Sequence, residues 1–148
     1  MTFLEILKYP HPCLDQVCDP VTSFDQSLWT LLEDMAATMT ASNGIGLAAN
    51  QVGTSLRAFV MRHPDGSVLE MANPRIVSQS GIENLNYEGC LSFPGKYAHT
   101  RRARHVHVEW QDRYGEPMNG SFFQIHAVCV QHEIDHLDGK TIAGGLTR

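Results

Sequence analysis

Long apolar runs are missing from this chain of 148 residues, and its first residues lack the pattern of an export signal. No stretch approaches the ~20 consecutive apolar residues that a membrane-spanning helix needs. Glu5 and Lys8 interrupt the apolar residues near the N-terminus almost at once, which argues against a secretory signal peptide. We therefore expect a protein without a membrane partner that works in the cytoplasm.

Positive charge is also scarce, because 11 Lys and Arg stand against 16 Asp and Glu and give a formal net charge of -5. Non-specific binding of nucleic acid requires a basic face, so we expect no nucleic-acid partner. The dense basic run at residues 101–104 caps a strand, contacts substrate or forms a solvated edge.

The most informative motif is the pentad His132-Glu133-Ile134-Asp135-His136. Helical positions four apart lie on one face, so His132 and His136 can bind a single metal ion. Glu133 lies beside them, where it can transfer protons for a metal-activated water. Helical spacing and a stop at Gly139 support a helix here, although two solvated histidines on a surface helix would match the same pattern.

A third metal ligand has to come from upstream of the pentad. The residues after His136 include no Glu, His or Cys, and Asp138 projects from a different side of the helix. Metzincin proteases place a third histidine after a glycine. Here Gly139 fits the glycine position, but Ile142 occupies the histidine position. The common protease forms of the motif are therefore excluded.

The four cysteines are the main upstream candidates, and their unpaired spacing fits a reducing compartment. Cys13 and Cys18 lie in a proline-rich arm and are interpreted as ordinary thiols. Cys129 is a turn too early on the same helix and is expected to be a small buried residue. Cys90 differs because glycines and a proline bracket it, and a thiolate on such a tight, exposed segment can reach a helix-borne metal.

A small-residue segment from Gly44 to Gln51 forms a third motif. Its glycines allow close approach of a ligand to the backbone, and it ends in an amide side chain. It contains no Gly-Lys-Ser/Thr sequence, so it is not a phosphate-binding loop. By itself, the segment favours a plain turn of small residues over a ligand-binding loop.

Together the three segments resemble the peptide deformylase family. That family has a Gly-x-Gly-Leu-Ala-Ala-x-Gln segment, then Glu-Gly-Cys-Leu-Ser, then Gln-His-Glu-x-Asp-His. The chain carries all three in order, at residues 44–51, 88–92 and 131–136, and residues 6–12 are similar to the family's opening. There are two departures. His11 replaces an aspartate that is often found there, and few residues follow Ile142, as in short viral and other truncated members that lack a C-terminal helix.

The resemblance implies a metal-dependent hydrolase that removes the formyl group from the N-terminal methionine and releases formate. Cys90, His132 and His136 would hold one divalent ion, with iron(II) as the physiological metal and zinc, nickel or cobalt as alternatives. Glu133 would accept a proton from water and pass it to the departing amine. The Gln51 amide and the Leu91 backbone N–H would stabilise the oxyanion.

The same resemblance implies how N-formylmethionyl peptides bind. The backbone groups of Ile45, Gly46 and Gly89 would pair with an extended peptide, as a strand added to an edge. The pocket for the methionine side chain would be lined by Ile45, Ile125, Val128 and Cys129, although core packing explains Val128 equally well. The enzyme would meet the nascent chain in the cytoplasm, or in the host cytoplasm for a viral protein, with transient contact to the ribosome. We also expect full activity on short formylated peptides without any added partner.

Two other functions compete with this interpretation. A zinc endopeptidase could use the same pentad, but it would lack its usual third ligand. A non-catalytic metal-binding or ribosome-associated module could keep the fold, but binding alone requires neither Glu133 nor Gln51.

For the fold, the pattern predicts one catalytic domain over residues 1–148, of the α+β class, with mainly antiparallel sheets around the metal-binding helix. An extended arm precedes a helix at about residues 25–40, capped by Ser23 or Asp25. Strands are expected near residues 56–61, 68–72, 105–110 and 118–123, with a turn at residues 64–66. We also expect the core to be complete by Ile142.

Overall fold

The computed structural model describes residues 2–81 and 83–145, and the chain forms antiparallel sheets and two α-helices, which confirms the predicted α+β class. Five strands form one sheet in the order β1-β2-β3-β6-β7 and two more form a separate sheet. The strands of the larger sheet are β1 (Gly46–Ala48), β2 (Ala58–Arg62), β3 (Val68–Gln79), β6 (His105–Gln111) and β7 (Pro117–Phe123).

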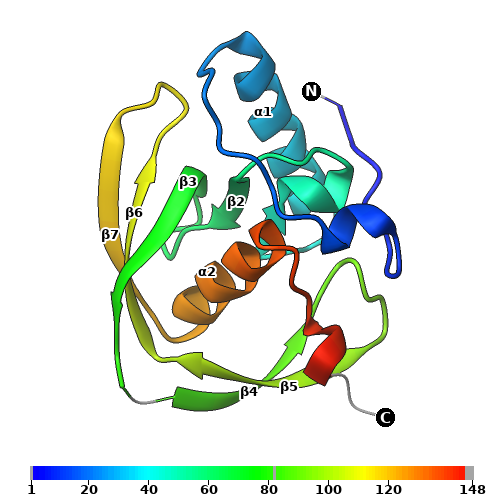
Figure 1. Ribbon diagram of the computed structural model, residues 1–148, viewed down its shortest axis with the longest axis vertical. Coiled ribbons are helices and arrows are strands. Elements are labelled where there is room, and N and C mark those ends of the chain that lie inside the picture. Colours follow the sequence, from blue (N-terminus) through cyan, green and yellow to red (C-terminus); the bar gives the residue numbers. More distant parts are fainter. Residues whose placement is uncertain (1, 82, 146–148) are drawn as a thin grey trace.

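The larger sheet separates the two helices, with α1 (Gln26–Ala41) on one face and α2 (Gln124–Leu137) on the other (Figure 1). Side chains of β2 alternate between the faces, as the period of a strand requires. Ala58 and Val60 belong to the α1 cluster, whereas Phe59 and Met61 belong to the α2 cluster. All four are fully buried, so β2 lies at the centre of the core, between the two helices.

Helix α1 matches the predicted helix to within a residue at each end. The Asp25 carboxylate accepts a hydrogen bond from the Leu28 N–H at 3.4 Å, which identifies Asp25 as the N-cap. The face that repeats every three or four residues is buried against the sheet through Leu28, Leu32, Met35 and Met39. Burying each such side chain stabilises the fold by about 1.5–3 kcal/mol.

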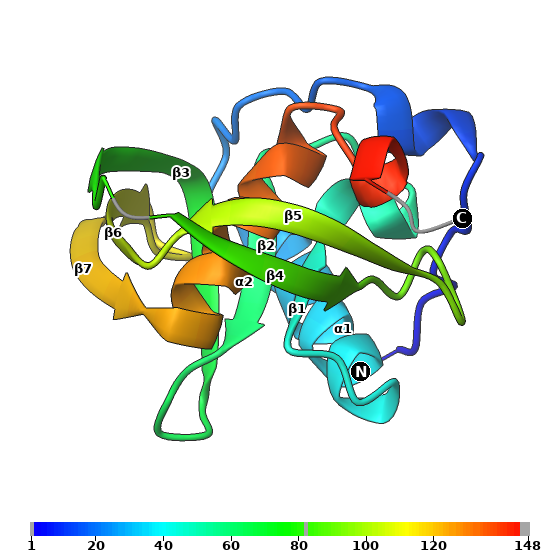
Figure 2. The same ribbon diagram turned by 90° about the horizontal axis from the view of Figure 1, so that it is seen from below.

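The second sheet consists of β4 (Glu83–Gly89) and β5 (Tyr97–Ala103), neither of which was predicted. Figure 2 shows this pair crossing α2 on the side away from the larger sheet. The basic run lies mostly within β5, and its member Arg102 is largely buried rather than at a solvated edge. Helix α2 is thus enclosed between two sheets.

The N-terminal arm is largely extended, as expected, but contains a short 3-10 helix at Pro12–Asp15. The His11 side chain accepts a hydrogen bond from the Cys13 N–H at 3.1 Å and caps this turn. The histidine that departs from the family pattern therefore has a structural role here. Farther along, the arm joins the C-terminal end of α2, where the Cys18 N–H donates to the Leu137 carbonyl at 2.8 Å. The arm therefore helps to fix the end of the histidine-bearing helix.

After α2 the chain turns at Gly139, whose φ of 73° lies in the left-handed region, as predicted for the helix stop. Ile142 begins a short 3-10 helix and is buried against Phe93 and Ala98, which agrees with its expected place in the core. The expectations for Leu146, Thr147 and Arg148 lie outside the described residues. Within residues 2–81 and 83–145, no helix has the length and apolar character needed to cross a membrane.

Candidate metal and substrate site

A cavity of about 740 Å³ opens between β1, β4 and α2. Every residue that the sequence predicted for metal, oxyanion or substrate binding lines this cavity, except His136, which is buried behind it. The lining members of that set are Ile45, Gly46, Gln51, Gly89, Cys90, Leu91, Ile125, Val128, Cys129, His132 and Glu133. Segments distant in sequence therefore meet in one place.

Cys90, His132 and His136 bring three potential ligand atoms together within 4.8 Å of one another. The two histidine Nε2 atoms are 3.2 Å apart, and the Cys90 Sγ is 3.4 Å from the His136 Nε2. An ion with tetrahedral bonds of about 2.0–2.1 Å to nitrogen and about 2.3 Å to sulfur would space its ligands about 3.3 and 3.6 Å apart. The observed spacing and donor set therefore fit a divalent ion such as zinc or iron(II).

Glu88 holds the ring of His132 from the side opposite this cluster. Its carboxylate contacts the His132 Nδ1 at 2.8 Å, which leaves Nε2 directed at the other two ligand atoms. Burial alone would raise the pKa of Glu88, but hydrogen bonds from His132, Arg102 and Thr100 outweigh it and lower the pKa to about 2. Glu88 is thus a carboxylate at neutral pH and fixes the histidine as an Nδ1 donor.

Arg102 connects this carboxylate to the outer part of α2. Its guanidinium donates to Glu88 at 2.8 and 3.0 Å and to Asp135 at 2.6 Å. Burial would lower the pKa of Arg102, but these two carboxylates raise it overall. The network therefore links β4, β5 and α2 around His132, and it gives the buried arginine of the basic run a defined partner.

The other histidine is held through its backbone. The Asn50 side chain donates from Nδ2 to the His136 carbonyl at 2.6 Å, and both residues are almost fully buried. Burial and the nearby His132 lower the pKa of His136, so its ring is neutral and can offer a lone pair to a metal. Asn50 lies inside the 44–51 motif, yet its role was not predicted because it depends on a residue far along the chain.

Glu133 lies at the cavity wall against Gly46 and Cys129 and is only 3% exposed. A Cβ at position 46 would come within 2.6 Å of the Glu133 Oε2 and 2.7 Å of the Cys129 Sγ, so a side chain there would have to displace this carboxylate and the thiol. Burial raises the pKa of Glu133 to about 7. A carboxylate with such a pKa can both accept and return a proton near neutral pH.

The Gln51 amide is oriented by hydrogen bonds at both of its ends. Its Oε1 accepts from the Ala48 N–H at 2.9 Å, and its Nε2 donates to the Ser92 Oγ at 3.1 Å and approaches the Cys90 Sγ at 3.6 Å. The NH₂ group is therefore directed to the Cys90 side of the cavity. Ser92 is a further contributor whose position the motif contained but whose role it did not indicate.

The residues predicted to line the pocket for a methionine side chain are only partly buried. Cys129 is buried, and burial raises the pKa of its thiol well above the ordinary value, so it is a neutral wall residue rather than a ligand. Ile45 and Val128 are half-buried, and Ile125 at the start of α2 is 61% exposed. Apolar side chains exposed at a cavity mouth are available to a ligand.

Comparison with known proteins agrees with this geometry. The family described as polypeptide deformylase matches residues 3–147. A peptide deformylase of Wolinella succinogenes is 44% identical over 143 residues, which cover 92% of this chain and 84% of the relative.

Solved structures give the same result. A peptide deformylase from Legionella pneumophila matches with a TM-score of 0.93 at 42% identity, covering 99% of this chain and 87% of that one. A Met-Ala-Ser-bound peptide deformylase from Acinetobacter baumannii matches with a TM-score of 0.90 at 31% identity, covering 97% and 98% of the two chains. The chain therefore belongs to the polypeptide deformylase family, whose members depend on a metal, and it removes the N-formyl group from newly made polypeptides.

Proposed function

We propose that Cys90, His132 and His136 hold one divalent ion, physiologically iron(II), and that the formamide bond is hydrolysed beside it. Zinc, nickel and cobalt suit the same donors. When bound, the ion supplies Lewis acidity and makes water a better nucleophile. The observation that carries this proposal is the meeting of the three ligand atoms within 4.8 Å at the cavity that contains Glu133.

Glu133 is the proton-transfer group in this proposal. It accepts a proton from the attacking water and passes it to the nitrogen of the departing amine. Its enclosed position beside Gly46 and its pKa of about 7 both support this role. The products are formate and a peptide with a free N-terminal methionine.

Gln51 and Leu91 supply the oxyanion donors. The Gln51 NH₂ group is already oriented by Ala48 and Ser92, so little reorganisation is needed when charge develops on the formyl oxygen. Leu91 follows Cys90 directly and lines the cavity, where its backbone N–H is the second donor.

The substrate lies in the slot between two strand edges. β1 pairs with β2 on one side, β4 pairs with β5 on one side, and the cavity lies between the other edges of β1 and β4. Ile45, Gly46 and Gly89 offer backbone groups there to an extended formylated peptide. Its methionine side chain then lies among Ile45, Ile125, Val128 and Cys129.

The test is formate release from formyl-Met-Ala-Ser, measured beside cleavage of longer peptides at internal bonds. We expect stoichiometric formate and no internal cleavage, in protein purified anaerobically with its metal content determined. Internal cleavage without formate would support an endopeptidase instead. Metal binding without either reaction would support a non-catalytic module.

Replacing Gln51 with alanine should lower kcat by ~10²- to 10³-fold with a smaller change in KM, because one oxyanion donor is lost. Steady-state formate release measures both constants. Ser92→Ala removes a partner of the same amide and is the matched comparison, for which we expect a smaller loss. A near-normal kcat for Gln51→Ala would reduce this residue to a structural role.

Replacing Glu88 with alanine should weaken metal affinity by about 10- to 100-fold, because His132 loses the group that orients its ring. The variant should also unfold more easily, by about 1–3 kcal/mol, because Arg102 loses one of its two carboxylate partners and keeps Asp135. Competition with a chelator measures the first effect and chemical denaturation the second. Glu70→Ala is the control, because it removes a carboxylate from a different ion pair, the one with Arg113. It should leave metal affinity unchanged.

We also propose that residues 1–148 act as one catalytic domain in the cytoplasm, with only transient contact to the ribosome. Short formyl-Met peptides should then be turned over by this chain with no partner added. The comparison is a variant carrying a C-terminal helix grafted from a longer relative. Turnover by the grafted chain alone would give the tail a role in folding or catalysis.

A further inference from the structure

Three aromatic rings form a cluster on the outer face of the β4–β5 sheet. Tyr87 stacks on Tyr97 with ring centroids 5.2 Å apart and planes 12° apart, and the His99 ring is tilted against Tyr87 with centroids 4.8 Å apart. Tyr87 faces His99 and Gly89 faces Tyr97 in the antiparallel register, so the two tyrosines are diagonal neighbours. Even so, Tyr87 is 59% exposed and Tyr97 is 47% exposed.

The two tyrosines stand at the rim of the cavity that contains the metal-ligand cluster. Tyr87, Gly89 and Tyr97 line the same cavity as His132 and Glu133. The opposite face of β4 carries Glu88, which contacts His132. β4 therefore holds His132 in place through Glu88 on its inner face and presents an aromatic surface through Tyr87 on its outer face.

The glycine at position 89 fixes where the Tyr97 ring lies. A Cβ at Gly89 would approach the Tyr97 Cε1 to 3.1 Å, so the ring covers the space that a side chain would fill. Stacking on Tyr87 restrains the same ring further. The pair is thus pre-organised beside the backbone of Gly89, which is proposed to pair with the substrate.

We infer that the Tyr87–Tyr97 stack is a specificity surface for a planar aromatic side chain in one of the two residues that follow formylmethionine. This inference rests on the proposed position of the substrate between β1 and β4. An extended peptide advances about 3.3 Å per residue and turns successive side chains to opposite sides. With methionine directed into the cavity, the residues that follow it pass the rim at Gly89.

Charge at the rim favours an aromatic group over a cation. Tyrosine faces attract both aromatic rings and cationic groups. Lys96 is exposed, adjoins Tyr97 in sequence and lines the same cavity. Its ammonium repels a lysine or arginine of the peptide, whereas it leaves the stacking of a phenylalanine or tyrosine unopposed.

The experiment compares kcat/KM among formylated tripeptides that differ in one side chain. Formyl-Met-Phe-Ser is compared with formyl-Met-Leu-Ser, and formyl-Met-Ala-Phe with formyl-Met-Ala-Leu, so that apolar size is matched and planarity is not. We expect phenylalanine to exceed leucine by about 3- to 10-fold at one of the two positions. Tyr97→Leu and Tyr87→Leu should each bring that ratio close to one, and Tyr97→Phe should keep it.

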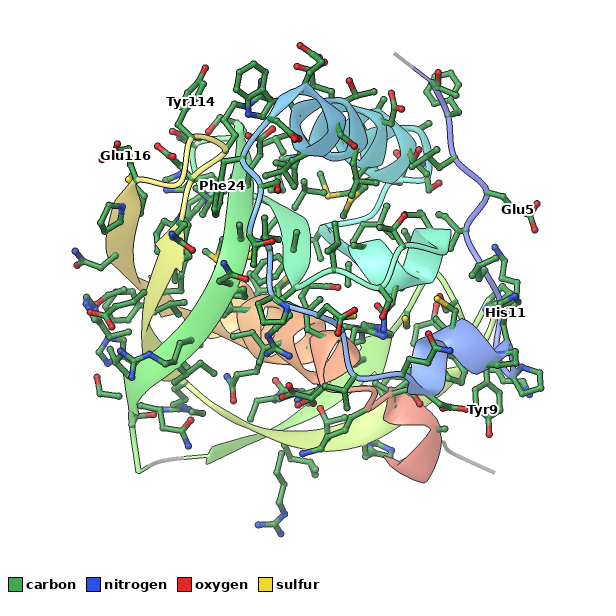
Figure 3. All side chains as sticks on the ribbon, turned by 45° about the horizontal axis from the view of Figure 1, so that its top comes forward. Glu5, Tyr9, His11, Phe24, Tyr114 and Glu116 are labelled. Atoms are coloured by element: carbon green, nitrogen blue, oxygen red, sulfur yellow. The ribbon has the colours of Figure 1, made fainter. Side chains whose placement is uncertain are left out.

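Tyr114→Leu is the matched control. Tyr114 is also an exposed tyrosine with an aromatic neighbour, Trp29 at 5.4 Å, but it lies at the β6–β7 turn, at the opposite side of Figure 3 from the β4–β5 sheet. The ratio of kcat/KM between the phenylalanine and leucine peptides should be the same in this variant as in the unaltered protein. Equal rates for phenylalanine and leucine at both positions would overturn the inference, and so would an aromatic preference that survives in both tyrosine variants. Formate release from formyl-Met-Ala-Ser reports separately on the deformylase reaction.

Discussion

Glu133→Gln should lower the rate of formate release by roughly 10⁴-fold, the upper end of what general acid–base catalysis contributes, because both proton transfers depend on this group. Glutamine keeps the size of the side chain in the tight space beside Gly46 and Cys129. It cannot accept the proton of the attacking water. The ion should remain bound, because the ligand atoms belong to other residues.

Two measurements on the same protein separate these roles. Single-turnover formate release reports the chemical step, and elemental analysis reports the metal-to-protein ratio. Glu109→Gln makes the same change at an exposed residue paired with Arg75 and controls for the lost charge. Joint loss of metal and activity in Glu133→Gln would identify this residue as a ligand rather than a proton carrier.

Regular, amphipathic elements of the fold could be predicted from the sequence. The helical repeat of α1 and the strict alternation of β6, with Val106 and Val108 buried, come from single periodic patterns. β3 was predicted to end at Ala72, but it continues to Gln79 past Asn73 and Pro74. The register shifts between Ala72 and Arg75, and Asn73 has a φ of 49°, so an irregularity absorbs the residues that normally end a strand.

β1, β4 and β5 were missed for a different reason. β1 has only three residues, all small or apolar, and β4 contains Asn, Glu and Gly, which have low strand propensity. β4 and β5 instead pair with each other, and their inner face is held by the contacts of Glu88 with Arg102 and His132. Such contacts join residues far apart in sequence, and local patterns do not reveal them.

The candidate site shows the same division. Gln51, Cys90 and Glu133, each of which lies in a recognisable local motif, line one cavity. The supporting partners were not predicted, although Asn50 and Glu88 lie inside those motifs. Their functions depend on His136 and His132, which are 86 and 44 residues away.

Cys90→Ala should abolish both metal retention and formate release, because two histidines alone leave the ion with one protein ligand fewer than a catalytic site of this kind uses. The change should spare the fold, since Cys90 is only partly buried and lies at the margin of the small cluster around Phe93. Elemental analysis after anaerobic purification gives the metal-to-protein ratio, and circular dichroism reports the fold.

Cys129→Ala is the matched control, because it removes a second thiol from the same cavity. Its sulfur lies beside Gly46 and Glu133, and burial keeps the thiol protonated, so the metal-to-protein ratio should not change. If Cys90→Ala kept a full equivalent of metal and Cys129→Ala lost it, the thiol ligand would be Cys129.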